Sequence, residues 1–138
     1  MKIEKVHGRQ VWDSRGRPTV EADIVLEGGS LGRAIAPAGA SRGSAEAVDL
    51  RDGGERFSGF GVSRAVQAVN TEIASALAGK RFSGQAMLDQ ELIALDGTPT
   101  KSRLGGNATT AVSMAFAQAQ AVHTGMPLWK WLAGERPV

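Results

Sequence analysis

The sequence predicts an α+β fold, in which a three-stranded antiparallel meander is followed by about four helices packed on one face of the sheet. Two patterns carry this prediction. Apolar and polar residues alternate in the first third of the chain, as in half-buried strands, whereas apolar residues recur at spacings of three and four in the rest, as in amphipathic helices. A chain of 138 residues is long enough for one domain with its own core.

Three strands are expected in the first third. The clearest pattern runs over 19–26, where every second residue is apolar, so one face of this strand is predicted to be buried. Residues 3–11 precede it as a first strand, and the Gly28-Gly29 turn leads to a third strand over 30–36. Short connections favour antiparallel neighbours. Because the helices are expected on one face of the sheet, the other face is free for a covering element outside this sequence.

The helices follow a long loop. Pro37 ends the third strand, and the glycine-rich segment 38–61 is expected to be a loop with a short helical turn near 45–50. Long loops in compact domains are often functional. Helices are predicted over 62–77, from a Ser83 cap to residue 95, over 107–122 and in a last turn around Trp129 and Trp131. Tryptophans in such a turn are typical of a core or an interface.

Composition excludes several classes of function. Sixteen basic and fourteen acidic side chains leave a formal charge of +2, and the basic residues are scattered, so no nucleic-acid partner is predicted. The absence of cysteine excludes disulfides, thiolate zinc sites and a cysteine nucleophile. No apolar run approaches the ~20 residues that cross a membrane, and the start of the chain lacks the apolar region of a signal peptide. We therefore expect a cytoplasmic protein without a membrane partner.

Few residues are arranged for catalysis. His7 and His123 lie far apart in the sequence and have no acidic neighbour, so neither is predicted to be catalytic. Asp49, Asp52 and Glu55 are close together, but charged loop residues are usually solvated, and a metal role for them is the less favoured alternative. We expect no catalytic residue in this chain.

The segment 37–43 is the best candidate for ligand binding. Its small residues let the backbone approach a ligand closely, and its glycines suit the hinges of a lid. Ser41 offers a hydroxyl and a carbonyl oxygen, which are hard ligands suited to magnesium, and Arg42 offers a positive charge for an anion. Taken alone, the motif is weak, because a turn of small residues after a strand is common.

Five stretches, in order and with near-family spacing, resemble enolase. They are 13–21, 36–53, 61–70, 95–108 and 125–128. This resemblance covers nearly the whole chain and implies the amino-terminal domain of an enzyme that dehydrates 2-phosphoglycerate to phosphoenolpyruvate in glycolysis. It implies that residues 1–138 are a capping domain, and that the C-terminal βα barrel is absent from this chain. In the family that barrel holds the lysine base, the acidic catalyst and the carboxylates of the first magnesium, so the chain alone is predicted to be inactive.

The resemblance also assigns a substrate-binding loop. It implies that Gly39, Ala40, Ser41 and Arg42 belong to the mobile loop that closes the active site, and that Ser41 ligates the second magnesium when the loop is closed. Arg42 stands where threonine is usual in the family. One interpretation is that this arginine binds the substrate phosphate. The other is that it indicates a divergent member of the superfamily that acts on another carboxylate. A third alternative is a stand-alone, non-catalytic interaction module.

The resemblance implies a subunit interface as well. Residues matching Arg9, Arg15 and Glu21 form ion pairs with the barrel of the other subunit in the family's homodimers. The expected partners are therefore an enolase barrel domain and a second subunit, giving a homodimer or higher oligomer for the full-length protein. The alternative interpretation is that these charges are simply solvated on an exposed strand face.

Overall fold

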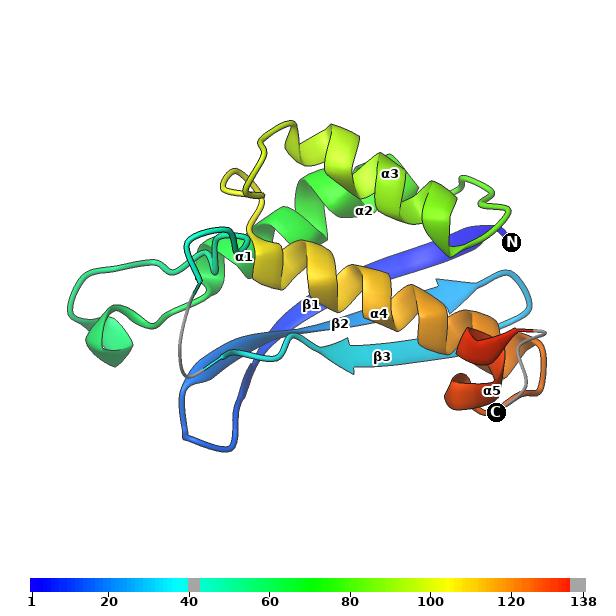
Figure 1. The fold of residues 1–138 in the computed structure, drawn as a ribbon, viewed down its shortest axis with the longest axis horizontal. Helices are drawn as coiled ribbons and strands as arrows, with labels where there is room; N and C mark the ends of the chain where they lie inside the picture. Colours follow the sequence, from blue (N-terminus) through cyan, green and yellow to red (C-terminus); the bar gives the residue numbers. More distant parts are fainter. Residues whose placement is uncertain (40–42, 135–138) are drawn as a thin grey trace.

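The computed structural model describes residues 1–39 and 43–134, and its first third is the predicted meander. Strands β1 (Ile3–Trp12), β2 (Pro18–Leu26) and β3 (Leu31–Ile35) pair antiparallel in the order β1-β2-β3. Their bounds lie within one residue of the predicted ones. A short turn joins each strand to the next, as antiparallel neighbours allow (Figure 1).

From Ser63 onward, the regular elements of the described chain are helices, as predicted. Ser63 begins one continuous helical stretch, in which a π-helical turn separates two α-helical parts. Two longer helices and a short last one follow it, so the strand and helix regions are segregated along the chain as in α+β domains. The elements are α1 (Ser63–Ala68), η2 (Val69–Ile73), α2 (Ala74–Leu77), α3 (Gln85–Asp96), α4 (Gly106–His123) and α5 (Leu128–Ala133).

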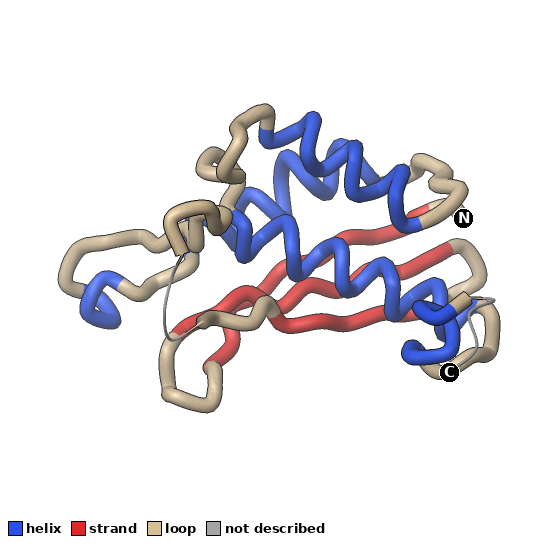
Figure 2. The backbone as a smooth tube through the Cα atoms, viewed as in Figure 1, coloured by secondary structure: helices blue, strands red, loops and turns tan. Residues whose placement is uncertain are grey.

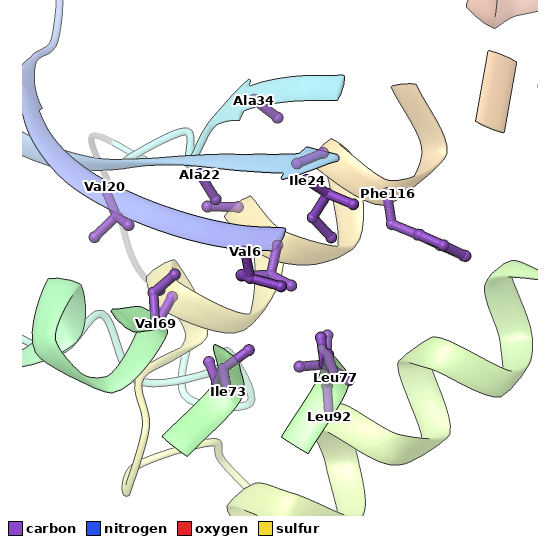
Figure 3. Packing of buried hydrophobic residues seen from close by; sticks show 14 of the residues in the cluster. Val6, Val20, Ala22, Ile24, Ala34, Val69, Ile73, Leu77, Leu92 and Phe116 are labelled. Atoms are coloured by element: carbon purple, nitrogen blue, oxygen red, sulfur yellow. The ribbon is translucent and has the colours of Figure 1, made fainter. Parts of the chain in front are cut away.

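The helices cover one face of the sheet. Helix α4 lies along β2 and β3, while α1, η2 and α2 pack against β1, and α3 lies outside against α4 (Figures 1 and 2). The alternating residues Val20, Ala22 and Ile24 of β2 point into this layer and are fully buried, together with Phe116 of α4 (Figure 3). The predicted packing of helices on one face is confirmed.

The second face of β2 departs from the expected pattern. Glu21 and Asp23 point away from the helices, yet each is only 9% exposed. Their register partners Arg9 on β1 and Arg33 on β3 lie on either side and contact them. Long arginine side chains cover the central strand because β2 has a neighbour on both edges.

Helix α4 approaches β3 so closely that only glycine fits at the contact. A Cβ atom built on Gly32 would lie 2.0 Å from the carbonyl oxygen of Ala115 and 2.2 Å from the nitrogen of Ala119. Both alanines are fully buried in α4. The small residues of helix and strand therefore set the spacing of the two layers.

Two local predictions are wrong. Residues 45–50 form a turn followed by extended chain instead of a helical turn, because the backbone of Val48 bonds to Thr100 and Gly106. The short helical turn occurs later, as η1 (Arg56–Gly59). Helix α3 is preceded by Gly84 and has no side-chain cap, while the Ser83 hydroxyl lies 3.6 Å from the Met87 sulfur.

The core alternative for the tryptophans in α5 is also wrong. Trp129 is 60% exposed and Trp131 is half-buried, so neither belongs to the core of this chain. The interface alternative for them stays a prediction. Within the described parts of the chain, no helix combines the length and the apolar character needed to cross a membrane.

We predict that Gly32→Ala lowers the free energy of unfolding by more than about 3 kcal/mol, because the added methyl overlaps backbone atoms that cannot move aside. Chemical denaturation measures the change. Gly84→Ala is the matched control, since a Cβ there meets nothing within 4 Å, and it should cost less than about 1 kcal/mol. Equal losses in the two variants would contradict the close approach of α4.

Candidate functional site

The long loop between β3 and α1 borders a pocket beside the first turn of α4. The pocket has a volume of about 210 Å³. Of the predicted loop residues, Gly39 lines it, whereas Ala40, Ser41 and Arg42 lie outside the described residues. The lining comes from both arms of the loop and from α4: Ala36, Pro37, Ala38, Gly39, Glu46, Ala47, Asp49, Gly106, Asn107 and Thr110.

The first arm of the loop is held by the sheet. The N–H of Ala36 donates to the carbonyl of Val20 at 2.8 Å, and the Thr19 hydroxyl donates to the carbonyl of Ala36 at 2.8 Å. Two residues further on, the Arg15 guanidinium donates to the carbonyl of Ala38 at 2.7 Å. The chain therefore leaves β3 in a defined direction.

The second arm returns through a small turn closed by Glu46. Its carboxylate Oε1 accepts a hydrogen bond from the N–H of Gly43 at 2.9 Å, and its own N–H donates to the Gly43 carbonyl at 3.3 Å. The N–H of Val48 then donates to the Thr100 carbonyl at 2.7 Å. This arm is thus joined to the segment that leads into α4.

The amide of Asn107 ties the end of this arm to α4. Its Oδ1 accepts from the N–H of Leu50 at 3.2 Å, and its Nδ2 donates to the Leu50 carbonyl at 3.0 Å. Both residues are buried, so the side chain satisfies two backbone groups that water does not reach. From the sequence, Asn107 is expected only to begin a helix. The one feature of the sequence that hints at its contact with Leu50 is a polar residue among small ones.

Gly106 brings the helix and the loop into backbone contact. Its N–H donates to the carbonyl of Val48 at 2.7 Å. A Cβ atom on Gly106 would lie 2.8 Å from the Cβ of Ala47 and 3.2 Å from the Val48 oxygen. A larger residue would push the second arm away from α4, so glycine here belongs to the pocket wall.

Two of the three acidic residues singled out in the loop, Asp49 and Asp52, bind groups within the chain. Asp52 accepts hydrogen bonds from the N–H groups of Ser63 at 2.8 Å and Arg64 at 2.9 Å, which caps the start of α1. Asp49 is paired with the Arg51 guanidinium at 2.8 Å. Among residues 1–39 and 43–134, no three His, Asp or Glu side chains gather closely enough to hold a metal ion.

The predicted interface residues fall into two places. Arg9 and Glu21 are register partners on the open face of the sheet and are in direct contact, whereas Arg15 lies in the β1–β2 turn beside the loop. Sequence reasoning missed Asp23 and Arg33, which complete a charged quartet with Arg9 and Glu21. The pairing of the strands was the signal that could have found them.

The quartet is electrostatically satisfied within the chain. Arg33 binds Asp23 through two hydrogen bonds at 2.7 and 2.9 Å, and Arg9 contacts both carboxylates. Hydrogen bonds from Arg33, and then from Arg9, hold the pKa of Asp23 well below its usual range although burial acts in the opposite direction. The open face therefore presents fixed charges.

The two histidines remain apart. His7 lies exposed on β1, and the His123 Nδ1 atom, at the end of α4, lies 3.5 Å from the Ser30 hydroxyl. A catalytic base needs a reacting partner within hydrogen-bond reach and a group that orients it. The described residues bring no such set together around either histidine.

The architecture and site define a class of protein: an α+β domain that presents a long loop and a pocket at the start of a helix. Residues 3–132 match the family model described as "Enolase, N-terminal domain". The chain belongs to this family.

A relative supports the same assignment. The chain is 57% identical over 132 residues to a protein of Aeropyrum pernix named enolase. The matched region covers 96% of this chain and 31% of the relative, so the chain spans about a third of the length of the curated relative it matches. The resemblance inferred from the sequence motifs is confirmed at the level of the domain family.

We predict that Asn107→Ala releases the second arm of the loop, because two buried backbone groups of Leu50 lose their partner at a cost of about 1–3 kcal/mol. Amide hydrogen exchange at Leu50 should accelerate by at least about tenfold. Asn70→Ala is the matched control, since Asn70 holds the N–H and carbonyl of Gly8 in the same way. Acceleration at Leu50 in both variants alike would show that Asn107 is not the tether.

Proposed function

We propose that this chain is the capping domain of an enolase that dehydrates 2-phosphoglycerate to phosphoenolpyruvate, and that it supplies the loop that closes the active site. The observation that carries the proposal is the 57% identity over 132 residues to a protein named enolase. The test is formation of phosphoenolpyruvate by the full-length protein. Dehydration of another carboxylate instead would favour a divergent enzyme, and a chain encoded without any barrel would favour an interaction module.

The geometry of the loop supports this role. The chain on either side of segment 40–42 is tied to the domain, since Ala38 is held by Arg15 and Val48 by Thr100 and Gly106. A loop tied at both flanks can carry a short segment to a substrate without rearranging the domain, as lid closure requires. The pocket bordered by Gly39 lies at the foot of this loop.

The chemistry of the proposed reaction explains what a closing loop would contribute. Removing a proton next to a carboxylate builds up negative charge, which enolase-type sites stabilise with magnesium ions. A ligand carried on a closing loop adds stabilisation only once the substrate is bound, and closure excludes water. We propose Gly39, Ala40, Ser41 and Arg42 as this substrate-facing segment, with Ser41 as the metal ligand.

The described residues do not make a magnesium site by themselves. The acidic residues at the pocket are already engaged, Glu46 by Gly43 and Asp49 by Arg51. Magnesium requires near-octahedral oxygen ligation, which one serine cannot provide. In our proposal the remaining ligands come from the barrel, the substrate and water.

We predict that the 138-residue chain alone does not turn over 2-phosphoglycerate, because the proposed base, acid and first metal site belong to the barrel. The assay compares the purified chain with a heat-treated sample at saturating magnesium. Turnover above this background would place catalytic groups within the chain and overturn the assignment of a capping domain.

In the full-length enzyme, Ser41→Ala should slow proton abstraction and weaken the second magnesium while leaving the first in place. The loss of one coordinating residue removes stabilisation that exists only in the closed state. Exchange of the substrate α-proton with solvent measures the first effect, and metal titration of the substrate complex measures the second. An unchanged exchange rate with unchanged metal stoichiometry would remove Ser41 from the mechanism.

We further propose that Arg9, Arg15 and Glu21 lie at a subunit interface of the full-length homodimer. The double variant Arg15→Ala with Glu21→Ala should raise the dimer dissociation constant, because two charged contacts across the interface are lost. Sedimentation across a dilution series measures this change. A dissociation constant equal to that of the wild type would show that the charges act only within the chain.

A further inference from the structure

The turn between β1 and β2 lies against the first arm of the loop. Residues of this turn and of the chain leaving β3 line a common hollow, among them Asp13, Arg15, Ala36 and Ala38. Across it, the Nη2 atom of Arg15 donates to the carbonyl of Ala38 at 2.7 Å. These residues are 23 positions apart in the sequence, so the contact is tertiary.

Asp13 fixes the turn from which Arg15 reaches the loop. Its Oδ1 atom accepts hydrogen bonds from the backbone N–H groups of Arg15 at 2.8 Å and Arg17 at 2.9 Å. Its Oδ2 atom is buried, forms no hydrogen bond within the described residues, and lies 3.6 Å from Nη2 of Arg15. The guanidinium is thus held between a carboxylate and the Ala38 carbonyl.

The charge on Asp13 persists at neutral pH. The N–H of Arg17, supported by that of Arg15, lowers the pKa of this carboxyl below its ordinary value. A guanidinium also keeps its charge under all physiological conditions. The contact therefore combines a fixed ion pair with a charge-assisted hydrogen bond, which is stronger than a bond between neutral groups.

The carbonyl group that Arg15 binds belongs to a residue of the pocket wall. Ala38 is the residue before Gly39, and Gly39 lines the pocket and opens the proposed substrate-facing segment. The sheet holds the chain as far as Ala36, through Val20 and Thr19. Arg15 extends this support by two residues, to Ala38 in the wall of the pocket.

We propose that Arg15 is a positioning residue that acts within its own chain, setting the position of Ala38 and hence of the pocket wall that Ala38 and Gly39 form. This inference rests on the proposed enolase function and goes beyond the intersubunit role proposed for the same residue. An interface role makes activity depend on the dimer, whereas a positioning role lowers activity in the intact dimer.

The experiment uses the full-length protein at concentrations where sedimentation shows every variant to be dimeric. Arg15→Ala should lower kcat about tenfold, equivalent to about 1.4 kcal/mol, with a smaller change in KM for 2-phosphoglycerate. Arg15→Lys should recover part of this loss, because lysine keeps one charged donor. Arg17→Ala is the matched control, since Arg17 lies in the same turn but its guanidinium stacks on Phe60, and it should retain the wild-type kcat.

Hydrogen exchange of the full-length protein gives a readout that does not depend on turnover. Amides of the peptide spanning 36–39 should exchange faster in Arg15→Ala than in the wild type or Arg17→Ala. If the wild type fails to act on 2-phosphoglycerate, the proposed function is wrong, and this exchange pattern alone decides whether Arg15 holds the loop.

Three results would overturn the positioning role. One is a wild-type kcat for Arg15→Ala wherever the dimer is intact, which would leave only an interface role. Another is an equal loss in Arg17→Ala, which would indicate a general effect of removing charge from the turn. The third is unchanged exchange over 36–39 in Arg15→Ala.

Discussion

The close packing of α4 on the sheet is the constraint on which the rest of the structure depends. Gly32 lets the helix backbone approach β3, and fully buried alanines of α4 maintain that spacing. The first turn of the same helix, through Gly106 and Asn107, then fixes the second arm of the loop. A helix held rigidly on the sheet can position a loop at its end because protein interiors are close-packed and deform little.

The two arms of the loop are held by different physical means. The second arm joins α4 through buried backbone groups paired with Gly106 and Asn107, where unpaired groups would be costly. The first arm ends on a charge-assisted contact from Arg15, at a site about a third exposed. This contrast suits the proposed lid, because the second arm is tied to buried groups at Leu50 and the start of α4, whereas the first arm is held next to the proposed substrate-facing segment by a partly exposed contact.

The charged side chains on the open face of the sheet are held in place by contacts within the chain. Arg9 and Arg33 lie beside the carboxylates of β2, and these contacts keep Asp23 charged. Ordered side chains lose less entropy on association than free ones, so a prearranged face is well suited to the proposed subunit contact. The same contacts explain how Glu21 and Asp23 can be buried as charges, since each has an arginine beside it.

The sequence by itself determined the strand and helix order, the antiparallel meander and the buried alternation of β2, because these follow from hydrophobic periods and short turns that are local properties of the chain. The motifs also identified the domain family. Only the tertiary structure decided that Asn107 pairs with Leu50, that Arg15 reaches Ala38, and that Asp23 and Arg33 complete a quartet. Those contacts join residues from different elements, and their geometry depends on how closely the layers pack, which no local pattern encodes.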